Sequence, residues 1–208
     1  LPGQPGNKKL LLPLVFKPQT QPPADYTIKN WNFEQGHVSW TEYSQSGYPT
    51  IYSTSSGLPS SVIPTSGSWA AWIGGSYSDV SSISQQITAH PQKRLTSRIY
   101  IVSQETSCTN DYFYVKVNGN VVFQYGLCDE HETGGWGSLY VNLTSYGNQK
   151  ITVTLEVRTN GSLNSNVFMD DFVWETTLNE DDEVLDIMEI IPATPAITVP
   201  ESALPKEQ

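Results

Sequence analysis

Short runs of alternating apolar and polar residues fill the middle of the chain, and turn residues separate them. In residues 150–157 every second side chain is apolar, which is the period of a strand with one buried face. The step Asn118-Gly119 lies between two β-rich runs, and Asn-Gly is a strong local signal for a hairpin. No stretch within residues 26–177 keeps a helical period. The pattern predicts an all-β domain, either a sandwich or a barrel.

Proline-rich segments flank this block at both ends. Residues 1–25 contain six prolines, and we expect a disordered linker there because such a sequence gives little to bury. Residues 178–208 are acidic and proline-rich, and we expect a disordered, solvated tail. A short amphipathic helix over residues 182–191 is the alternative, since the apolar residues there fall near helical spacing. We therefore predict one globular domain, 26–177, between two extensions.

Charge is sparse and unevenly distributed. Only 15% of the 208 residues are charged, and the formal net charge is −10. Nine of the 21 acidic residues lie from Glu175 onward, so the folded part is close to neutral. A near-neutral domain with no basic stripe is not expected to bind nucleic acid. The apolar run at residues 10–16 is interrupted by Pro13 and is too short to cross a bilayer, so we expect no membrane insertion.

The chain contains two cysteines, Cys108 and Cys128, which bracket one hairpin-like stretch. In a secreted protein we expect a disulfide, which closes a loop of about twenty residues and contributes about 3 kcal/mol. The alternative is a pair of buried thiols in a cytosolic protein. Zinc is not expected, because two cysteines without a nearby ligand pair supply half a site. Abundant Ser, Thr and Asn with 11% aromatic residues are typical of extracellular β-proteins. We predict a secreted or cell-surface chain, as part of a larger protein.

Four motifs in order resemble one group of extracellular domains. They are NWNFEQG at 30–36 followed by Trp40, PTSGSWAAWIGG at 64–75, Gly135-Trp136 with LTSYGNQKITV at 143–153, and NSNVFMDDFV at 164–173. Together they resemble bacterial carbohydrate-binding modules of the family 4, 9 and 22 type, and the related galactose-binding-like and MAM-like jelly-roll domains. The resemblance implies a jelly-roll β-sandwich of two antiparallel sheets. This fold serves sugar binding, adhesion and plain spacing alike, so function needs separate evidence.

The resemblance also implies a structural calcium site with Glu34 and Asp170 as side-chain ligands, and Asp171 is a third candidate. The first and last strands of a jelly-roll commonly lie side by side, so these carboxylates can meet. Calcium prefers six to eight oxygen ligands, which combine carboxylates with loop carbonyls. Carboxylates in an apolar strand need a partner, and no Lys or Arg is adjacent in the sequence. The alternative is that these residues simply face solvent.

Aromatic residues are more numerous than a core of this size requires, and sugar rings stack on exposed aromatic faces. The resemblance implies core positions for Trp40 and Trp72, and we expect Trp174 to be packed as well. Trp69 should face away from Trp72, because three positions separate them on a strand. We predict a platform for a polysaccharide or cell-surface glycan, drawn from Tyr43, Tyr48, Tyr52, Trp69, Tyr112 and Trp136. For each of these residues the alternative is a role in closing the sandwich or capping a loop.

No catalytic constellation is evident in the sequence. The three histidines lack metal-binding spacing, and no serine lies in a Gly-x-Ser-x-Gly motif. A glycosidase pair built on Glu34 would need a sugar-sized cleft between two carboxylates, whereas its expected position is a sheet edge. We therefore predict a non-catalytic binding or accessory module. The alternatives are an adhesion or spacer domain without sugar binding, and a fragment of an enzyme whose catalytic half is absent.

Overall fold

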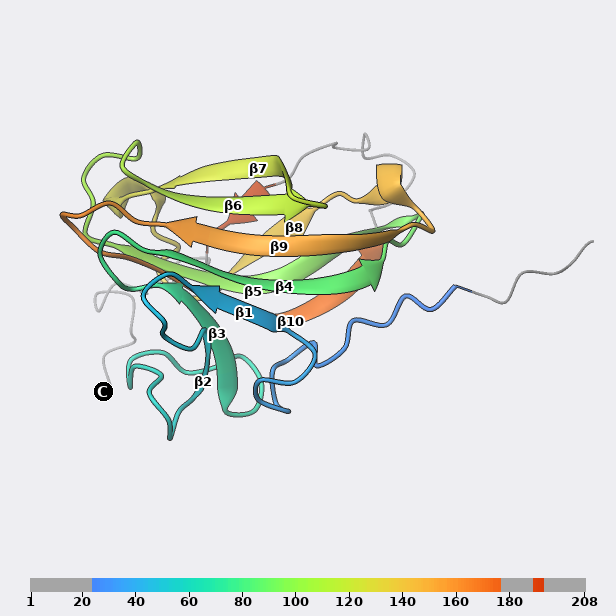
Figure 1. The fold of residues 1–208 in the computed structure, drawn as a ribbon, viewed down its shortest axis with the longest axis horizontal. Coiled ribbons are helices and arrows are strands. Elements are labelled where there is room, and N and C mark those ends of the chain that lie inside the picture. The colour runs from blue at the N-terminus through green and yellow to red at the C-terminus, as the bar shows by residue number, and fades with distance from the viewer. Residues whose placement is uncertain (1–23, 177–188, 193–208) are drawn as a thin grey trace, which may run out of the picture.

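The computed structural model describes residues 24–176 and 189–192, whose strands form two antiparallel sheets packed face to face (Figure 1). The five-stranded sheet has the order β1 (Thr41–Ser44), β4 (Val80–Thr88), β9 (Lys150–Arg158), β6 (Asp111–Val117) and β7 (Asn120–Leu127). The six-stranded sheet has the order β11 (Glu189–Ile191), β8 (Gly137–Val141), β5 (Lys93–Ser103), β10 (Ser165–Thr176), β3 (Trp69–Gly74) and β2 (Ile51–Ser53). Two short 3₁₀ helices, η1 (Asp129–His131) and η2 (Thr144–Tyr146), lie in the connections.

Most connections pass from one sheet to the other. Among strands β1 to β10, consecutive strands pair as neighbours only in β2–β3 and β6–β7. This alternation between two antiparallel sheets is the jelly-roll arrangement, and it confirms the predicted all-β sandwich.

The Asn-Gly step forms the β6–β7 hairpin, as predicted. Asn118 has φ 50° and Gly119 has φ 84°, and a type I′ turn needs positive φ at both of these positions. The flanking residues Val117 and Asn120 pair directly. Asparagine and glycine tolerate this backbone better than other residues, so the turn sets the register of the two strands.

The core fills the space between the two sheets. Ile83 and Leu155 of the five-stranded sheet and Ile73, Ile99 and Ile101 of the six-stranded sheet are all fully buried and belong to one cluster. Strand β9 buries every second side chain toward this cluster, as its alternation predicts.

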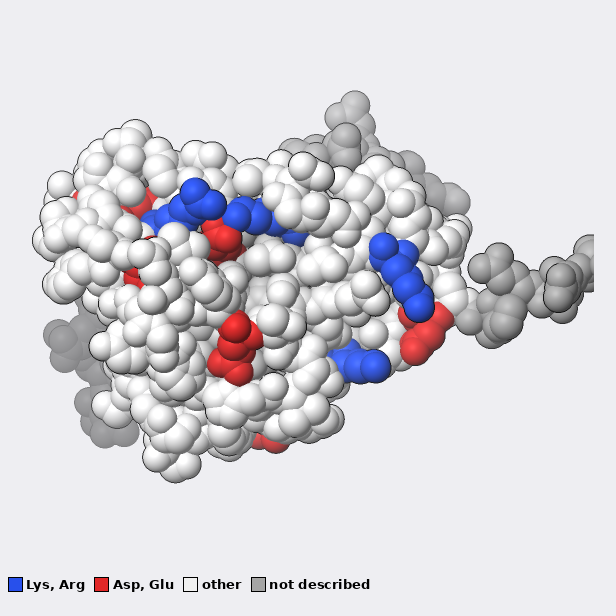
Figure 2. Space-filling view, in the orientation of Figure 1, with Lys and Arg blue, Asp and Glu red and all other residues white. Residues whose placement is uncertain are grey.

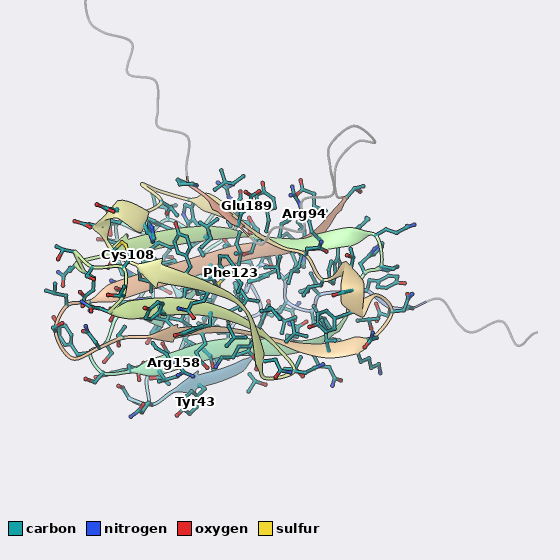
Figure 3. All side chains as sticks on the ribbon, turned by 90° about the horizontal axis from the view of Figure 1, so that it is seen from above. Tyr43, Arg94, Cys108, Phe123, Arg158 and Glu189 are labelled. Carbon is teal, nitrogen blue, oxygen red and sulfur yellow. A yellow bond between two sulfur atoms is a disulfide. The ribbon has the colours of Figure 1, made fainter. Side chains whose placement is uncertain are left out.

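Cys108 and Cys128 form a disulfide with a Cα–Cα distance of 4.8 Å (Figure 3), as predicted. It joins the segment before β6 to the end of β7, at one edge of the five-stranded sheet. Gly126 makes the close approach possible, because a Cβ on it would lie 2.0 Å from the carbonyl oxygen of Cys108. The hairpin is therefore closed at both ends, by the turn and by the disulfide.

Strand β11 lies within the segment expected to be a solvated tail. Ile190 pairs with Leu139 of β8 and packs against the core. At these three residues the structure has a paired strand, where a solvated tail or the end of a helix was expected. The physical reason is that β8 offers a free row of backbone groups that an extended apolar segment can pair with. Residues 1–23, 177–188 and 193–208 lie outside the described residues.

None of the helices in the described part is long and apolar enough to cross a membrane.

Candidate functional site

The last long strand brings two carboxylates to the loop before β3. Strand β10 has a register shift between Asp170 and Val173, and Asp171 has a positive φ of 51°. Asp170 is fully buried, and its Oδ2 accepts hydrogen bonds from the backbone N–H groups of Thr65 (2.9 Å) and Ser66 (3.1 Å). Asp171 accepts from the hydroxyls of the same two residues, at 2.7 and 2.6 Å.

Glu34 binds the other end of the same loop. Its Oε1 accepts from the N–H groups of Ser68 (2.8 Å) and Trp69 (2.7 Å). Gly67, directly before these two residues, has a φ of 57°, and a Cβ on it would lie 2.0 Å from the Glu34 carboxyl carbon. The three residues predicted as metal ligands therefore surround one loop, residues 65–69, although Glu34 lies near the start of the domain's sequence and Asp170 and Asp171 lie near its end.

This group of carboxylates is anionic and has no ion-pair partner in the described part of the chain. Burial raises the pKa of Asp170 to about 6, hydrogen bonds from Ser66 and Thr65 oppose the rise, and the Asp171 carboxylate adds to it. Arg98 lies opposite Asp170 in the sheet. Its guanidinium donates instead to Ser138 Oγ and to the carbonyl oxygen of Trp136.

In this structure, N–H and hydroxyl groups of the loop are therefore the hydrogen-bond partners of these carboxylates, a role for which the sequence suggested a cation. The ligand atoms of Cys108, Cys128 and His131 lie within 4.8 Å of one another, but both sulfurs are already joined in the disulfide. Among the described residues, the carboxylates of Glu34, Asp170 and Asp171 do not form a comparably compact group.

The structure reverses the expected roles of two tryptophans. Trp69 and Trp72 do point to opposite faces of β3, but Trp69 packs on the main core and Trp72 lies on the outer face. Strand β3 is apolar on both sides, because a loop covers its outer face and the core covers its inner face. Its composition therefore could not show which tryptophan faces inward.

A second apolar cluster lies on the outer face of the six-stranded sheet, beneath the β2–β3 loop. It consists of Tyr52, Leu58, Val62, Ala70, Trp72, Tyr100, Trp136 and Phe168. The Trp136 indole N–H donates to the carbonyl oxygen of Ile63 at 2.7 Å, which pins the loop over the sheet. This contact is of the kind expected if Trp136 closes the sandwich or caps a loop, which is the alternative to a place in a sugar-binding platform.

Tyr43 and Tyr112 lie on the outer face of the five-stranded sheet, which we call the tyrosine face. The strand register places Tyr43, Ser82, Glu156, Tyr114 and Gln124 in one row across all five strands. Tyr43 is 54% exposed, and Figure 3 places it on the same side of the molecule as Arg158. The Tyr112 and Tyr114 ring centroids lie 5.8 Å apart.

Three charged residues cross the tyrosine face. Glu156 forms ion pairs with Lys116 (2.5 Å) and Arg158 (2.7 Å). Burial opposes ionisation of Glu156, but these two cations outweigh it and hold its pKa below the ordinary value. The Arg158 guanidinium lies 5.3 Å from the ring centroid of Tyr114. In Figure 2, which looks onto this face, a band of charged side chains crosses a mostly uncharged surface.

Sequence reasoning missed Tyr114 as a candidate. The signal was available, because Tyr112 and Tyr114 are two positions apart on an alternating strand and must share a face. The remaining candidates, Tyr48 and Tyr52, lie at the edge of the sandwich and line a cavity there.

No protein-family model matches this chain, and no curated protein matches it. Among solved structures, it is similar to the carbohydrate-binding module TmCBM61 in complex with β-1,4-galactotriose, with 16% identity and a TM-score of 0.49 over 74% of this chain and 99% of that one. It is also similar to CBM28, a module specific for non-crystalline cellulose, with 14% identity and a TM-score of 0.48 over 74% of this chain and 97% of that one. A third similar structure is an adhesin domain of Lys-gingipain, with 14% identity and a TM-score of 0.43 over 70% of this chain and 96% of that one. At these values the likeness carries no argument about the fold or the ligand of this chain.

Proposed function

We propose that this chain is a non-catalytic carbohydrate-binding module that binds a glycan along the tyrosine face. The observation that supports this most is the row of tyrosines with hydrogen-bonding side chains between them. Tyr43 and Tyr114 lie on separate strands of the outer face, and Ser82 and Gln124 lie in the same row. Aromatic faces with a few placed polar groups are the usual means of holding a sugar.

The dimensions of the face favour a chain over a single ring. Neighbouring strands are about 4.8 Å apart, so the row from β1 to β7 spans roughly 19 Å. The disulfide at the β6–β7 edge supports an oxidising, extracellular setting. We propose a secreted or cell-surface setting for that reason.

The test is binding of the full chain to a panel of soluble neutral polysaccharides, measured by affinity electrophoresis and isothermal titration calorimetry. Replacing Tyr114 by alanine should weaken binding about tenfold, because one aromatic contact contributes about 0.5–1.5 kcal/mol beyond its buried area. Tyr140→Ala is the matched control, since Tyr140 lies on β8 of the other sheet. A well-folded chain that binds no glycan would favour an adhesion or spacer domain.

The second part of the proposal is a structural calcium ion held by Glu34, Asp170 and Asp171. All three residues offer the hard carboxylate oxygens that calcium prefers. In this structure these oxygens accept hydrogen bonds from the loop at residues 65–69 and do not form a compact group, so the ion would have to displace those donors. The raised pKa of Asp170 also fits, since the buried carboxylate has no cation paired with it in the described part of the chain. A bound cation would offset this charge and tie the loop at residues 65–69 to both ends of the domain.

A further inference from the structure

A cavity of about 230 Å³ opens at the edge of the sandwich, apart from the tyrosine face. It lies between the edge strands β1 and β2, where β3 turns into β4. Ser44 and Ser81, which line it, pair with each other on the inner side of the five-stranded sheet, whereas Tyr43 faces outward. Its volume is below the roughly 300–1,000 Å³ of pockets for drug-sized ligands, so it suits one small ring.

Aromatic side chains form two walls and the rim of this cavity. The rings of Tyr52 and Trp72 meet at 53° with centroids 5.5 Å apart. The Trp72 indole N–H donates to Asn166 at 3.0 Å, which fixes the orientation of the indole. Gly75 allows this packing, because it has a φ of 78° and a Cβ on it would lie 2.8 Å from the Trp72 ring. Tyr48 is 61% exposed at the rim and is free to cover a ligand.

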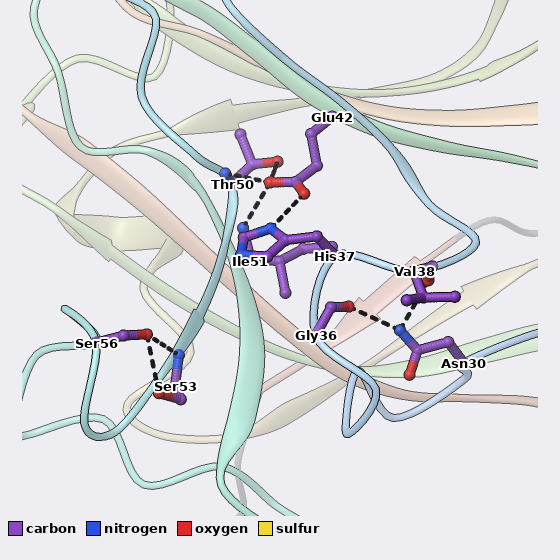
Figure 4. Close-up of polar contacts among 9 residues, drawn as sticks. All are labelled: Asn30, Gly36, His37, Val38, Glu42, Thr50, Ile51, Ser53 and Ser56. Carbon is purple, nitrogen blue, oxygen red and sulfur yellow. Dashed lines mark hydrogen bonds and ion pairs between the residues drawn. The ribbon is translucent and has the colours of Figure 1, made fainter.

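Two carboxylates from distant parts of the sequence hold the β1–β2 connection in place around the cavity. Glu42 accepts hydrogen bonds from the backbone N–H groups of Thr50 (2.7 Å) and Ile51 (3.1 Å) (Figure 4). Asp79 is 2% exposed and accepts from the Ser46 N–H at 2.8 Å. The connection is thus ordered before any ligand arrives, which lowers the entropy cost of binding.

The polar groups of the cavity point to an uncharged, hydroxyl-rich ligand. Among the residues that the structure describes, no Lys, Arg or His lines the cavity, so an anion would meet Asp79 with no cation from them to balance it. The hydroxyl of Tyr52 makes no hydrogen bond to other described residues, and burial and the Glu42 charge raise its pKa, so it remains a donor. Thr50 and Ser81 add hydroxyls, and the aromatic walls suit the apolar face of a sugar ring.

We propose that this cavity is a second binding site, which holds one neutral sugar ring of the pyranose class. The site goes beyond the proposed function, because it is separate from the tyrosine face and would act whether or not that face binds a glycan chain.

The test uses the full chain and four monosaccharides, D-glucose, D-galactose, D-mannose and D-xylose, each at millimolar concentrations. Saturation-transfer NMR and tryptophan fluorescence report on binding near Trp72. We expect at least one of the four to bind. Tyr48→Ala should weaken that binding about tenfold, and Tyr52→Phe, which removes only a hydroxyl, should weaken it several-fold.

Two control variants separate this site from the proposed function. Tyr140→Ala, a tyrosine on β8 that does not line the cavity, should leave monosaccharide binding unchanged. Tyr114→Ala should also leave it unchanged while weakening polysaccharide binding. The proposal is overturned if none of the four sugars binds, or if binding survives both Tyr48→Ala and Tyr52→Phe in variants whose thermal melts match the parent chain. Loss through Tyr114→Ala alone would place the sugar on the tyrosine face instead.

Discussion

The buried carboxylate of Asp170 should make the metal-free protein more stable in mild acid. Its pKa is about 6 in the folded chain against an ordinary 3.8, so folding favours the protonated form. The stabilisation from protonation is fully present below the ordinary pKa and is lost as pH rises through 6. A difference of about two pKa units corresponds to about 3 kcal/mol in the free energy of unfolding.

Urea unfolding at a series of pH values between about 4 and 8, with a chelator present, measures this effect. The matched control is Asp170→Asn, which keeps the size of the side chain and cannot titrate. Asp111 also has a raised pKa through burial, and Glu156 has a lowered one, so the difference between the two profiles isolates Asp170. Parallel profiles for the parent chain and Asp170→Asn would refute the reasoning. With saturating calcium the sign should reverse, because protons then compete with the ion.

Three further outcomes are expected. Adding calcium at a hundredfold excess over its dissociation constant should raise the free energy of unfolding by about 2.7 kcal/mol, and a melting temperature unchanged by chelation would exclude the calcium proposal. Replacing both Cys108 and Cys128 by serine should cost about 3 kcal/mol in urea unfolding, with an equal loss on reduction of the parent chain as the check. Gly75→Ala should destabilise the fold by about 1–3 kcal/mol through its positive φ and the contact with Trp72, and a stable variant that still binds monosaccharide would contradict the account of the cavity.

Local patterns were sufficient to predict much of the fold. The alternation of residues 150–157 and the turn at Asn118-Gly119 depend on neighbours in sequence, and both appear as β9 and the β6–β7 hairpin. The two cysteines were the only possible pair in the chain, so the disulfide followed once an oxidising compartment was assumed.

The chemistry of the candidate sites depends on contacts that no local pattern encodes. Asp170 meets the loop at Thr65 across more than a hundred positions, so its partners could not be found by searching for nearby cations. The resemblance placed Trp72 at a core position, and the covering loop on the outer face is what makes both faces of β3 apolar. The cavity at the sandwich edge arises only where β1, β2 and the β3–β4 turn meet.

Because Ile190 pairs with Leu139, the position at which the domain is truncated should affect whether it self-associates. A chain shortened to residue 177 would lack β11 and would leave β8 as an open edge with its backbone donors and acceptors facing water. Such an edge can take up a strand from a second copy, so the shortened protein is expected to self-associate while the longer one remains single. Self-association of the shortened chain would then make its binding to a glycan surface multivalent for a reason unrelated to the site. The molecular mass in solution should therefore be measured alongside each binding experiment.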